Sequence, residues 1–227
     1  MLRYNNAMNG CFAGESGVLL AGRPLAGKVA VRLAQLRKGM EVVTPKEPRK
    51  IMKVLRMPVR GVEMCIIGGG GHEELVLVTP WHPVALREGG GGWQFPRDLA
   101  LRSVRYTGAV YSVLLERDED VDAHAMRIGG VWGVAMGHGL MREGRRRDVR
   151  AHQFYGNYNR VRRALAGLPE KPGGVVTGGG LTRDPETGLV NGFSTLKGTR
   201  AKLLTSDGGL VVVFKIVQRS ISSINVC

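Results

Sequence analysis

Residues 76–83 read VLVTPWHP, an apolar run that ends in a threonine and, three positions later, a histidine between two prolines. Successive valine and leucine are typical of a buried strand, and Pro80 ends it because proline lacks a backbone N–H for the ladder. Thr79 and His82 therefore stand where a strand leaves its sheet. A hydroxyl that polarises and an imidazole that donates a proton near neutral pH are a catalytic pair, although the same residues also occur as an ordinary strand end.

A cysteine far upstream gives this pair a chemical partner. Cys11 follows Gly10 and precedes Thr79 by 68 residues. A cysteine can attack the carbonyl directly before its own nitrogen and so exchange an amide for a thioester. The exchange is uphill, so the protein has to strain or polarise the amide and protonate its nitrogen, and a glycine before the cysteine eases the strained backbone. We predict Cys11, Thr79 and His82 as catalytic residues and Gly10–Cys11 as the scissile bond; the alternative is an ordinary free thiol.

A third stretch carries further histidines. The apolar run 110–115 leads through an acidic turn to His124, and residues 130–139 read GVWGVAMGHG. His124 is a candidate for a fourth catalytic residue, but a polar residue after an acidic turn explains it equally well. His138 either assists at the site or lies in a turn between glycines. His152 is expected in the connection before a helix.

The remaining pattern predicts an all-β domain. Glycine is the outlier, with 34 of 227 residues, roughly twice the usual share of about 7%, as expected for short strands joined by tight turns. A helix is predicted over 158–168, with Pro169 just beyond it. The tail after 193 shows no motif, although its apolar run 210–217 suits a strand. The other predicted strands are 29–31, 41–43, 51–55, 63–67, 75–78, 110–115 and a cluster within 125–136.

The net charge of +14 makes nucleic acid a candidate partner. Yet no aromatic residues alternate with the basic ones, and no helix-turn-helix or zinc-finger spacing occurs, so a solvated basic face is the preferred interpretation. The glycine runs lack the Lys-Ser/Thr of a phosphate loop, and the five histidines lack metal-ligand spacing. The sequence therefore predicts no cofactor and no metal.

Three cysteines, Cys11, Cys65 and Cys227, are too few and too scattered for a disulfide framework. Cys65 lies in an apolar run, where a cysteine is usually a small buried hydrophobe. No signal peptide and no run long enough to span a membrane is visible. We therefore expect a cytoplasmic protein without a membrane partner, in which a thiol stays reduced.

These motifs resemble the Hint superfamily, which includes inteins and the autoprocessing half of hedgehog proteins. Cys11 opens a stretch similar to the first block of the family, residues 79–82 match its T-x-x-H motif, and Val110-Tyr111 with His124 resemble its later block. The resemblance covers about residues 10–193. It is closest to the Hint domains found next to von Willebrand factor A (VWA) domains, which resemble this chain at residues 79–83, 130–132, 137–139, 148–152 and 183–189.

The resemblance implies a flat, horseshoe-like β-roll with two pseudo-two-fold halves, followed by a small helical and glycine-rich extension. Residues 1–10 would then be the remnant of an upstream segment, VWA-like in the full protein, and 11–145 the autoprocessing domain. Residues 146–193 would form an associated extension with one helix, and 194–227 a tail of unknown role.

The resemblance also implies the reaction, an N-to-S acyl shift of the Gly10–Cys11 bond in cis, once per molecule. No His-Asn pair stands near residues 131–139, which disfavours full splicing. Gly133 stands where this branch carries a second cysteine, which removes any step that needs a second thiol. The stretch around Arg56, where sterol transfer in the hedgehog branch needs an acidic residue, is basic, so sterol is disfavoured as the acceptor and we predict cleavage by water or another nucleophile. The alternatives are a catalytically weak Hint-fold binding or structural module beside a VWA domain, and a basic nucleic-acid-binding β-domain.

Overall fold

The structure is a computed structural model that describes residues 10–22, 29–68, 75–86, 92–100, 102–142 and 148–196. All of them belong to one of two units, Met1–Leu196. Most of the upstream segment and most of the tail, including the predicted strand at 210–217, lie outside the described residues. The sequence prediction of an all-β domain with a small helical extension is confirmed.

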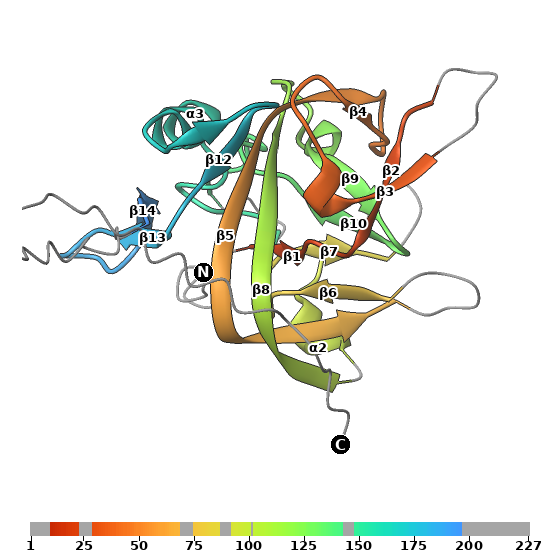
Figure 1. The fold of residues 1–227 in the computed structure, drawn as a ribbon, viewed down its shortest axis with the longest axis horizontal. Helices are drawn as coiled ribbons and strands as arrows, with labels where there is room; N and C mark the ends of the chain where they lie inside the picture. The colour runs from red at the N-terminus through yellow and green to blue at the C-terminus, as the bar shows by residue number, and fades with distance from the viewer. Residues whose placement is uncertain are drawn as a thin grey trace, which may run out of the picture. The chain divides into compact units, whose positions relative to one another are not determined.

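Two long strands form the centre of this unit. β5 (Arg49–Ile67) and β8 (Arg102–Leu115) pair antiparallel from Ile51 opposite Leu115 to Ile66 opposite Arg102. Figure 1 shows them side by side, with β1 (Phe12–Ala13) next to β8. The strands of the main sheet follow the order β6-β1-β8-β5-β4-β2-β9-β10-β7, with β3, β11 and β12 off this path.

The shorter strands extend this centre on both sides. β12 pairs with β5 in parallel, and β13 and β14 form a separate antiparallel pair. The remaining bounds are β2 Gly17–Leu20, β3 Val29–Arg32, β4 Glu41–Val42, β6 Val76–Val78, β7 Val84–Ala85, β9 Ala125–Ile128, β10 Val131–Val134, β11 Glu170–Lys171, β12 Val175–Thr177, β13 Gly180–Arg183 and β14 Val190–Ser194.

One prediction about these strands is wrong. We expected separate strands at 51–55 and 63–67, but β5 runs through both and through Pro58, which lies between them. Around Pro58 the strand pairs with β8, while its pairings with β12 and β6 cover only residues 54–56 and 65–67. A proline is tolerated at such a local edge because no ladder bond is lost there. The pairing of β5 with β8 shifts register between Val59 and Val62, at Gly61, whose φ is +61°. Such an irregularity bends the strand.

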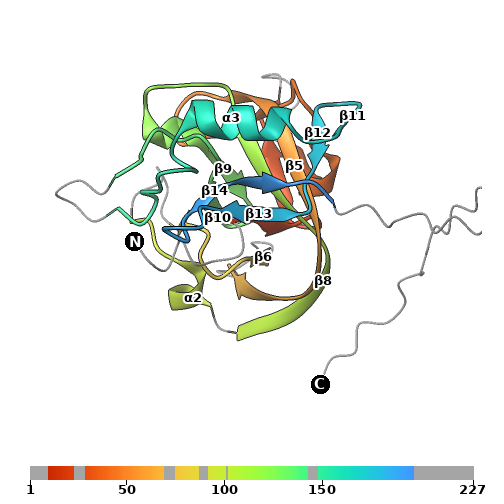
Figure 2. The same cartoon turned by 90° about the vertical axis from the view of Figure 1, so that its left-hand side faces the viewer.

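The helices are few and short. α3 (Tyr158–Ala166) starts at Asn157, whose side chain accepts a hydrogen bond from the Arg160 N–H, and buries Val161 and Leu165. It agrees with the helix predicted at 158–168. α3, β13 and β14 lie on the same side of the unit, which faces the reader in Figure 2. Within the described ranges, the other helical segments are α2 (Pro96–Leu99) and the 3-10 turns Leu33–Gln35 and Val121–His124.

The core consists of two clusters, and the chain around Cys11 takes part in both. Phe12 belongs to the first cluster, with Val18, Ile128 and others, whereas Cys11 and Ala13 belong to the second, which α3 covers. This division follows from strand geometry, because successive side chains point to opposite faces. Cys11 is therefore held by packing on both sides of its own backbone.

Candidate active site at the Gly10–Cys11 bond

Strand β1 brings two distant parts of the chain to Cys11. Phe12 pairs with Val78 of β6 on one side and with Tyr111 of β8 on the other. The residues that follow Val78 and Tyr111 are Thr79 and Ser112, so both hydroxyls flank the residue before Phe12. The antiparallel register alone thus places a hydroxyl on each side of Cys11.

Thr79 holds the nitrogen of the predicted scissile amide. The Cys11 N–H donates to Thr79 Oγ1 at 3.0 Å, and the Thr79 N–H donates to the Cys11 carbonyl at 2.9 Å. Thr79 is 4% exposed, so these bonds lie in an environment of low dielectric constant, where they are stronger than in water. The threonine contacts the atom that has to leave if Cys11 attacks Gly10.

His82 lies against Gly10 from the loop between β6 and β7. Its Nε2 lies 3.0 Å from the Val134 carbonyl, and a carbonyl only accepts, so Nε2 carries the proton and Nδ1 of the neutral ring is free of one. A Cβ atom at position 10 would stand 2.9 Å from Nδ1. The close approach explains why a residue without a side chain precedes Cys11.

The His82 ring is buried and neutral. Burial lowers its pKa to about 4, against the smaller opposing effect of the Gly10 and Val134 backbone groups. Nδ1 has no hydrogen-bond partner of normal geometry among the described residues. The Phe12 ring packs on the imidazole edge-to-face, with centroids 4.4 Å apart. The ring is thus fixed by one hydrogen bond and one aromatic contact, and its free nitrogen is turned to the Gly10 side.

Ser112 is a site residue that the sequence reasoning missed. Its Oγ lies 3.1 Å from Cys11 Sγ and donates a hydrogen bond to the Gly10 carbonyl oxygen. Ser112 is 6% exposed. The sequence carried one signal for it: Ser112 is the one aliphatic hydroxyl in the otherwise apolar or aromatic run 110–115, and a buried polar group needs a partner.

The Cys11 thiol is protonated in this setting. The side chain is 1% exposed, and burial raises its pKa to about 12, with the Ser112 hydrogen bond opposing the shift. At pH 7 a thiol with that pKa is ionised to about one part in 10⁵. Any attack by this sulfur therefore needs a route for its proton.

Two other predicted histidines have their contacts elsewhere. His124 Nε2 lies within 3.1–3.2 Å of the backbone O and N of Asp118, in the turn after β8. His138 Nδ1 accepts from the Leu140 N–H at 3.3 Å. Within the described residues, neither ring has a hydrogen bond to Gly10 or Cys11, so the turn interpretation fits the geometry of both. Their pKa values are lowered by burial, to about 4 for His124 and about 3 for His138.

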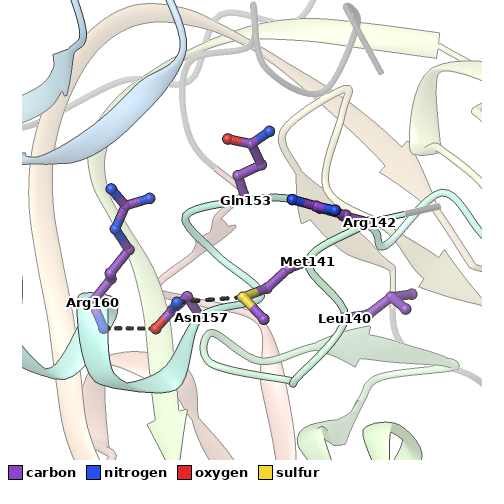
Figure 3. A pocket seen from close by; sticks show the side chains of 6 residues that line it. All are labelled: Leu140, Met141, Arg142, Gln153, Asn157 and Arg160. Atoms are coloured by element: carbon purple, nitrogen blue, oxygen red, sulfur yellow. Dashed lines mark hydrogen bonds between the residues drawn. The ribbon is translucent and has the colours of Figure 1, made fainter.

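The turn that contains His138 borders a pocket of about 470 Å³ (Figure 3). Asn157 donates to Met141 Sδ there, and the same side chain caps α3. None of the lining residues takes part in the contacts of Gly10 or Cys11. The pocket is lined by Leu140, Met141, Arg142, Gln153, Asn157 and Arg160.

Gly133 is explained by packing. A Cβ atom at this position of β10 would lie 2.5 Å from Cζ and 2.7 Å from Cε2 of Phe12, closer than carbon atoms approach. The Phe12 ring, which also contacts His82, fills the space that a cysteine side chain would need. Phe12, the residue next to Cys11, and the second thiol that the family resemblance predicts at position 133 therefore exclude each other in this arrangement.

Within the described ranges, no three His, Cys, Asp or Glu side chains gather in a way that could hold a metal ion. No helix there is long and apolar enough to cross a membrane. Cys11 and Cys65 are both free thiols.

The β-sheet fold and the threonine, histidine and cysteine at one peptide bond define a domain of the Hint class. A family model described as Vint, a Hint domain, matches residues 10–192, and the chain belongs to this family, whose wider superfamily is autocatalytic in general. Among solved structures, the 2.0 Å crystal structure of a DnaB intein from Synechocystis sp. PCC 6803 is similar, with 15% identity and a TM-score of 0.42 over 56% of this chain and 99% of the intein. No curated protein matches.

Proposed function

We propose that this Hint domain cuts the peptide bond between Gly10 and Cys11 in cis. The observation that carries the proposal is that one amide is contacted at both ends, because Thr79 accepts from its N–H and Ser112 donates to its carbonyl. The Cys11 thiol lies 3.1 Å from the same serine hydroxyl. A bond held at the oxygen and the nitrogen, with a nucleophile beside it, is arranged for acyl transfer.

The reaction starts with attack of Cys11 Sγ on the Gly10 carbonyl carbon. When the intermediate collapses, the C–N bond breaks and its electron pair stays on the Cys11 nitrogen, which takes up one proton. The neutral His82 has no proton on Nδ1 to give, so it first receives one from the intermediate and then delivers it to the nitrogen. Thr79 keeps that nitrogen in place during the exchange.

A thioester between Gly10 and Cys11 is the product of this step. Water or another nucleophile opens it, and the segment upstream of Cys11 is released with Gly10 at its C-terminus. The cysteine is restored, but its substrate is gone, so each molecule acts once. We propose a VWA-type domain as the segment that is released in the full protein, and the cytoplasm as a compartment that keeps Cys11 reduced.

Cleavage without splicing is the outcome that the residues favour. Splicing needs a second nucleophile and an asparagine that cyclises, and the sequence near 131–139 contains no His-Asn pair. Space for a second thiol at Gly133 is filled by Phe12. After the thioester forms, transfer to a nucleophile from outside the domain remains.

The alternative is a Hint fold retained as a binding or structural module. The observation in its favour is the burial of Cys11, which makes the thiolate rare at neutral pH. A module without activity would still need the fold, but it would not need the contacts of Thr79 and Ser112 with a single amide.

A fusion with a reporter protein before Met1 separates the two functions. Its intact mass is followed for days with and without dithiothreitol, which opens thioesters. We expect release of a fragment that ends at Gly10, faster with dithiothreitol, abolished in Cys11→Ala and slowed in His82→Ala. Cys65→Ala is the matched control, because Cys65 is also a buried free thiol but lies in β5. A wild-type fusion that stays whole with thiol present would overturn the cleavage function and leave the binding or structural module as the favoured one.

A further inference from the structure

The Ser112 hydroxyl bridges the two atoms that react. Its oxygen lies 3.1 Å from Cys11 Sγ, and its proton is donated to the Gly10 carbonyl oxygen. A hydroxyl has one proton and two lone pairs. Since the proton is directed at the carbonyl, a lone pair faces the sulfur, and the thiol is the donor in the contact between Cys11 and Ser112.

The direction of this chain of hydrogen bonds matters because the site offers few other proton acceptors. The His82 Nδ1 faces Gly10 and its Nε2 contacts Val134, and among the described residues no hydrogen bond joins the His82 ring to Cys11 Sγ. The ionised thiol is disfavoured by burial, which raises the pKa of Cys11 to about 12. A developing negative charge on the carbonyl oxygen would be disfavoured for the same reason. A mechanism that avoids both charges is therefore favoured in this dry environment.

We propose that Ser112 is a catalytic residue that relays the thiol proton of Cys11 to the carbonyl oxygen of Gly10. As the S–C bond forms, the thiol proton moves to Ser112 Oγ and the serine proton moves to the carbonyl oxygen, whose π electrons become the new O–H bond. Ser112 ends unchanged. The intermediate is neutral, with sulfur, nitrogen and a hydroxyl on one carbon.

The relay rests on the proposed function, because it describes how the same bond is attacked. The relay also assigns different residues to the two stages of the reaction. Ser112 acts in the addition on the carbonyl side, whereas Thr79 and His82 act in the collapse, in which the hydroxyl proton leaves and the nitrogen gains one. No free thiolate occurs at any point.

The test follows the reporter fusion at a dithiothreitol concentration that saturates the rate, so that the acyl shift is limiting. Ser112→Ala removes both the acceptor and the donor, and we expect a loss of about 10²- to 10³-fold, the usual effect of deleting one group that stabilises an acyl-transfer intermediate. Ser112→Thr keeps the hydroxyl and should recover most of the rate. Ser103→Ala is the matched control, an exposed serine of the same strand, and should leave the rate unchanged.

The pH profile provides a readout that a merely structural serine would not change. With the relay, the wild-type rate is flat between about pH 6 and 9, because neither the thiol nor His82 changes its protonation there. In Ser112→Ala only the thiolate can attack, so the rate should rise about tenfold per pH unit. In mixtures of light and heavy water, the wild-type rate should depend on deuterium content along a curve, since two protons move together.

The outcomes are distinct. A slow Ser112→Ala with a steep profile, beside a flat wild type, supports the relay. A Ser112→Ala rate equal to the wild-type rate, or a wild-type rate that rises tenfold per pH unit, overturns the relay while the cleavage function stands. A wild type that never cleaves overturns both. If Ser112→Ala does not fold, the wild-type isotope curve decides, and a straight line overturns the relay.

Discussion

At the scale of single residues, the need for glycine at position 10 comes from the side chains around it more than from the backbone conformations that glycine permits. The His82 ring takes the space where a side chain would start, with Nδ1 2.9 Å from a Cβ at that position. On the other side of the same peptide, Thr79 and Ser112 hold the nitrogen and the oxygen. Four side chains from three parts of the chain, Cys11 included, thus meet at one bond.

Gly10→Ala should slow cleavage by about tenfold to 10²-fold, because a displacement of about 1 Å at a reacting centre costs up to that much. The added methyl group pushes the imidazole away from the amide that it serves. The rate of fragment release from the reporter fusion measures the effect. Gly167→Ala is the control, since a Cβ there lies 3.6 Å from its nearest neighbour, and equal rates for the two variants would contradict the steric role of position 10.

Thr79→Val should both destabilise the domain and slow cleavage. The variant keeps the shape but removes the acceptor for the Cys11 N–H, and a buried donor without a partner costs about 1–3 kcal/mol. Thr79→Ser keeps the acceptor and should cleave close to the wild-type rate. Urea unfolding of the Cys11→Ala background, which stays uncleaved, gives the stability, and unchanged stability in Thr79→Val would show that the hydrogen bond matters little.

At the scale of elements, the two-residue strand β1 is the connection between core and site. Phe12 contacts the His82 ring and also occupies the space beside Gly133 in β10. The sequence predicted most strands and α3 correctly because alternation and turn residues are local signals. It did not predict that β5 continues through Pro58, because whether a proline is tolerated depends on which neighbouring strands pair there.

Gly133→Ala should cost about 1–3 kcal/mol of stability through overpacking, and it should slow cleavage by moving Phe12 and with it Cys11. Chemical unfolding and fragment release measure the two effects. The double variant with Phe12→Leu tests the contact directly, since the smaller side chain should relieve the clash and recover part of the lost stability. Strictly additive effects of the two substitutions would show that these residues do not interact.

At the scale of the described unit, the site could be predicted only in part. Cys11, Thr79 and His82 were recognisable because their types and spacing are distinctive, and the structure brings them together at the Gly10–Cys11 bond. Ser112 was missed because a single serine in a strand has no motif of its own. For His124 and His138 the sequence left a site role and a turn role open, because sequence distance does not reveal that each ring bonds to its own turn.

Among the described residues, four histidines are buried with lowered pKa values, and they make the unit sensitive to acid. For His82 the value falls from 6.5 to about 4, with burial as the largest cause, and those of His124, His138 and His152 fall for the same first reason. The unfolded chain binds more protons than the folded one between the two values, so stability rises with pH there. The stability that these neutral histidines contribute is complete above about pH 6.5 and is lost as the pH falls towards 4.

We therefore expect the urea midpoint of the Cys11→Ala domain to fall steeply between about pH 6.5 and 4.5, since each pKa unit corresponds to about 1.4 kcal/mol. His138→Gln, which cannot gain the charge, should flatten the fall relative to its own value at pH 7. A midpoint that stays constant over this range would contradict the burial of neutral rings.

Strand β1 begins one residue after the proposed cut, and this has a consequence for the product. The acyl shift would leave the new α-amine of Cys11 in the sheet between β6 and β8, held where the amide had been. Burial disfavours the ammonium form, so the amine would stay uncharged and nucleophilic beside the thioester. Until an external nucleophile removes the acyl group, this amine would attack the thioester and re-form the peptide bond. The rate at which the external nucleophile reacts would therefore set the yield of released segment.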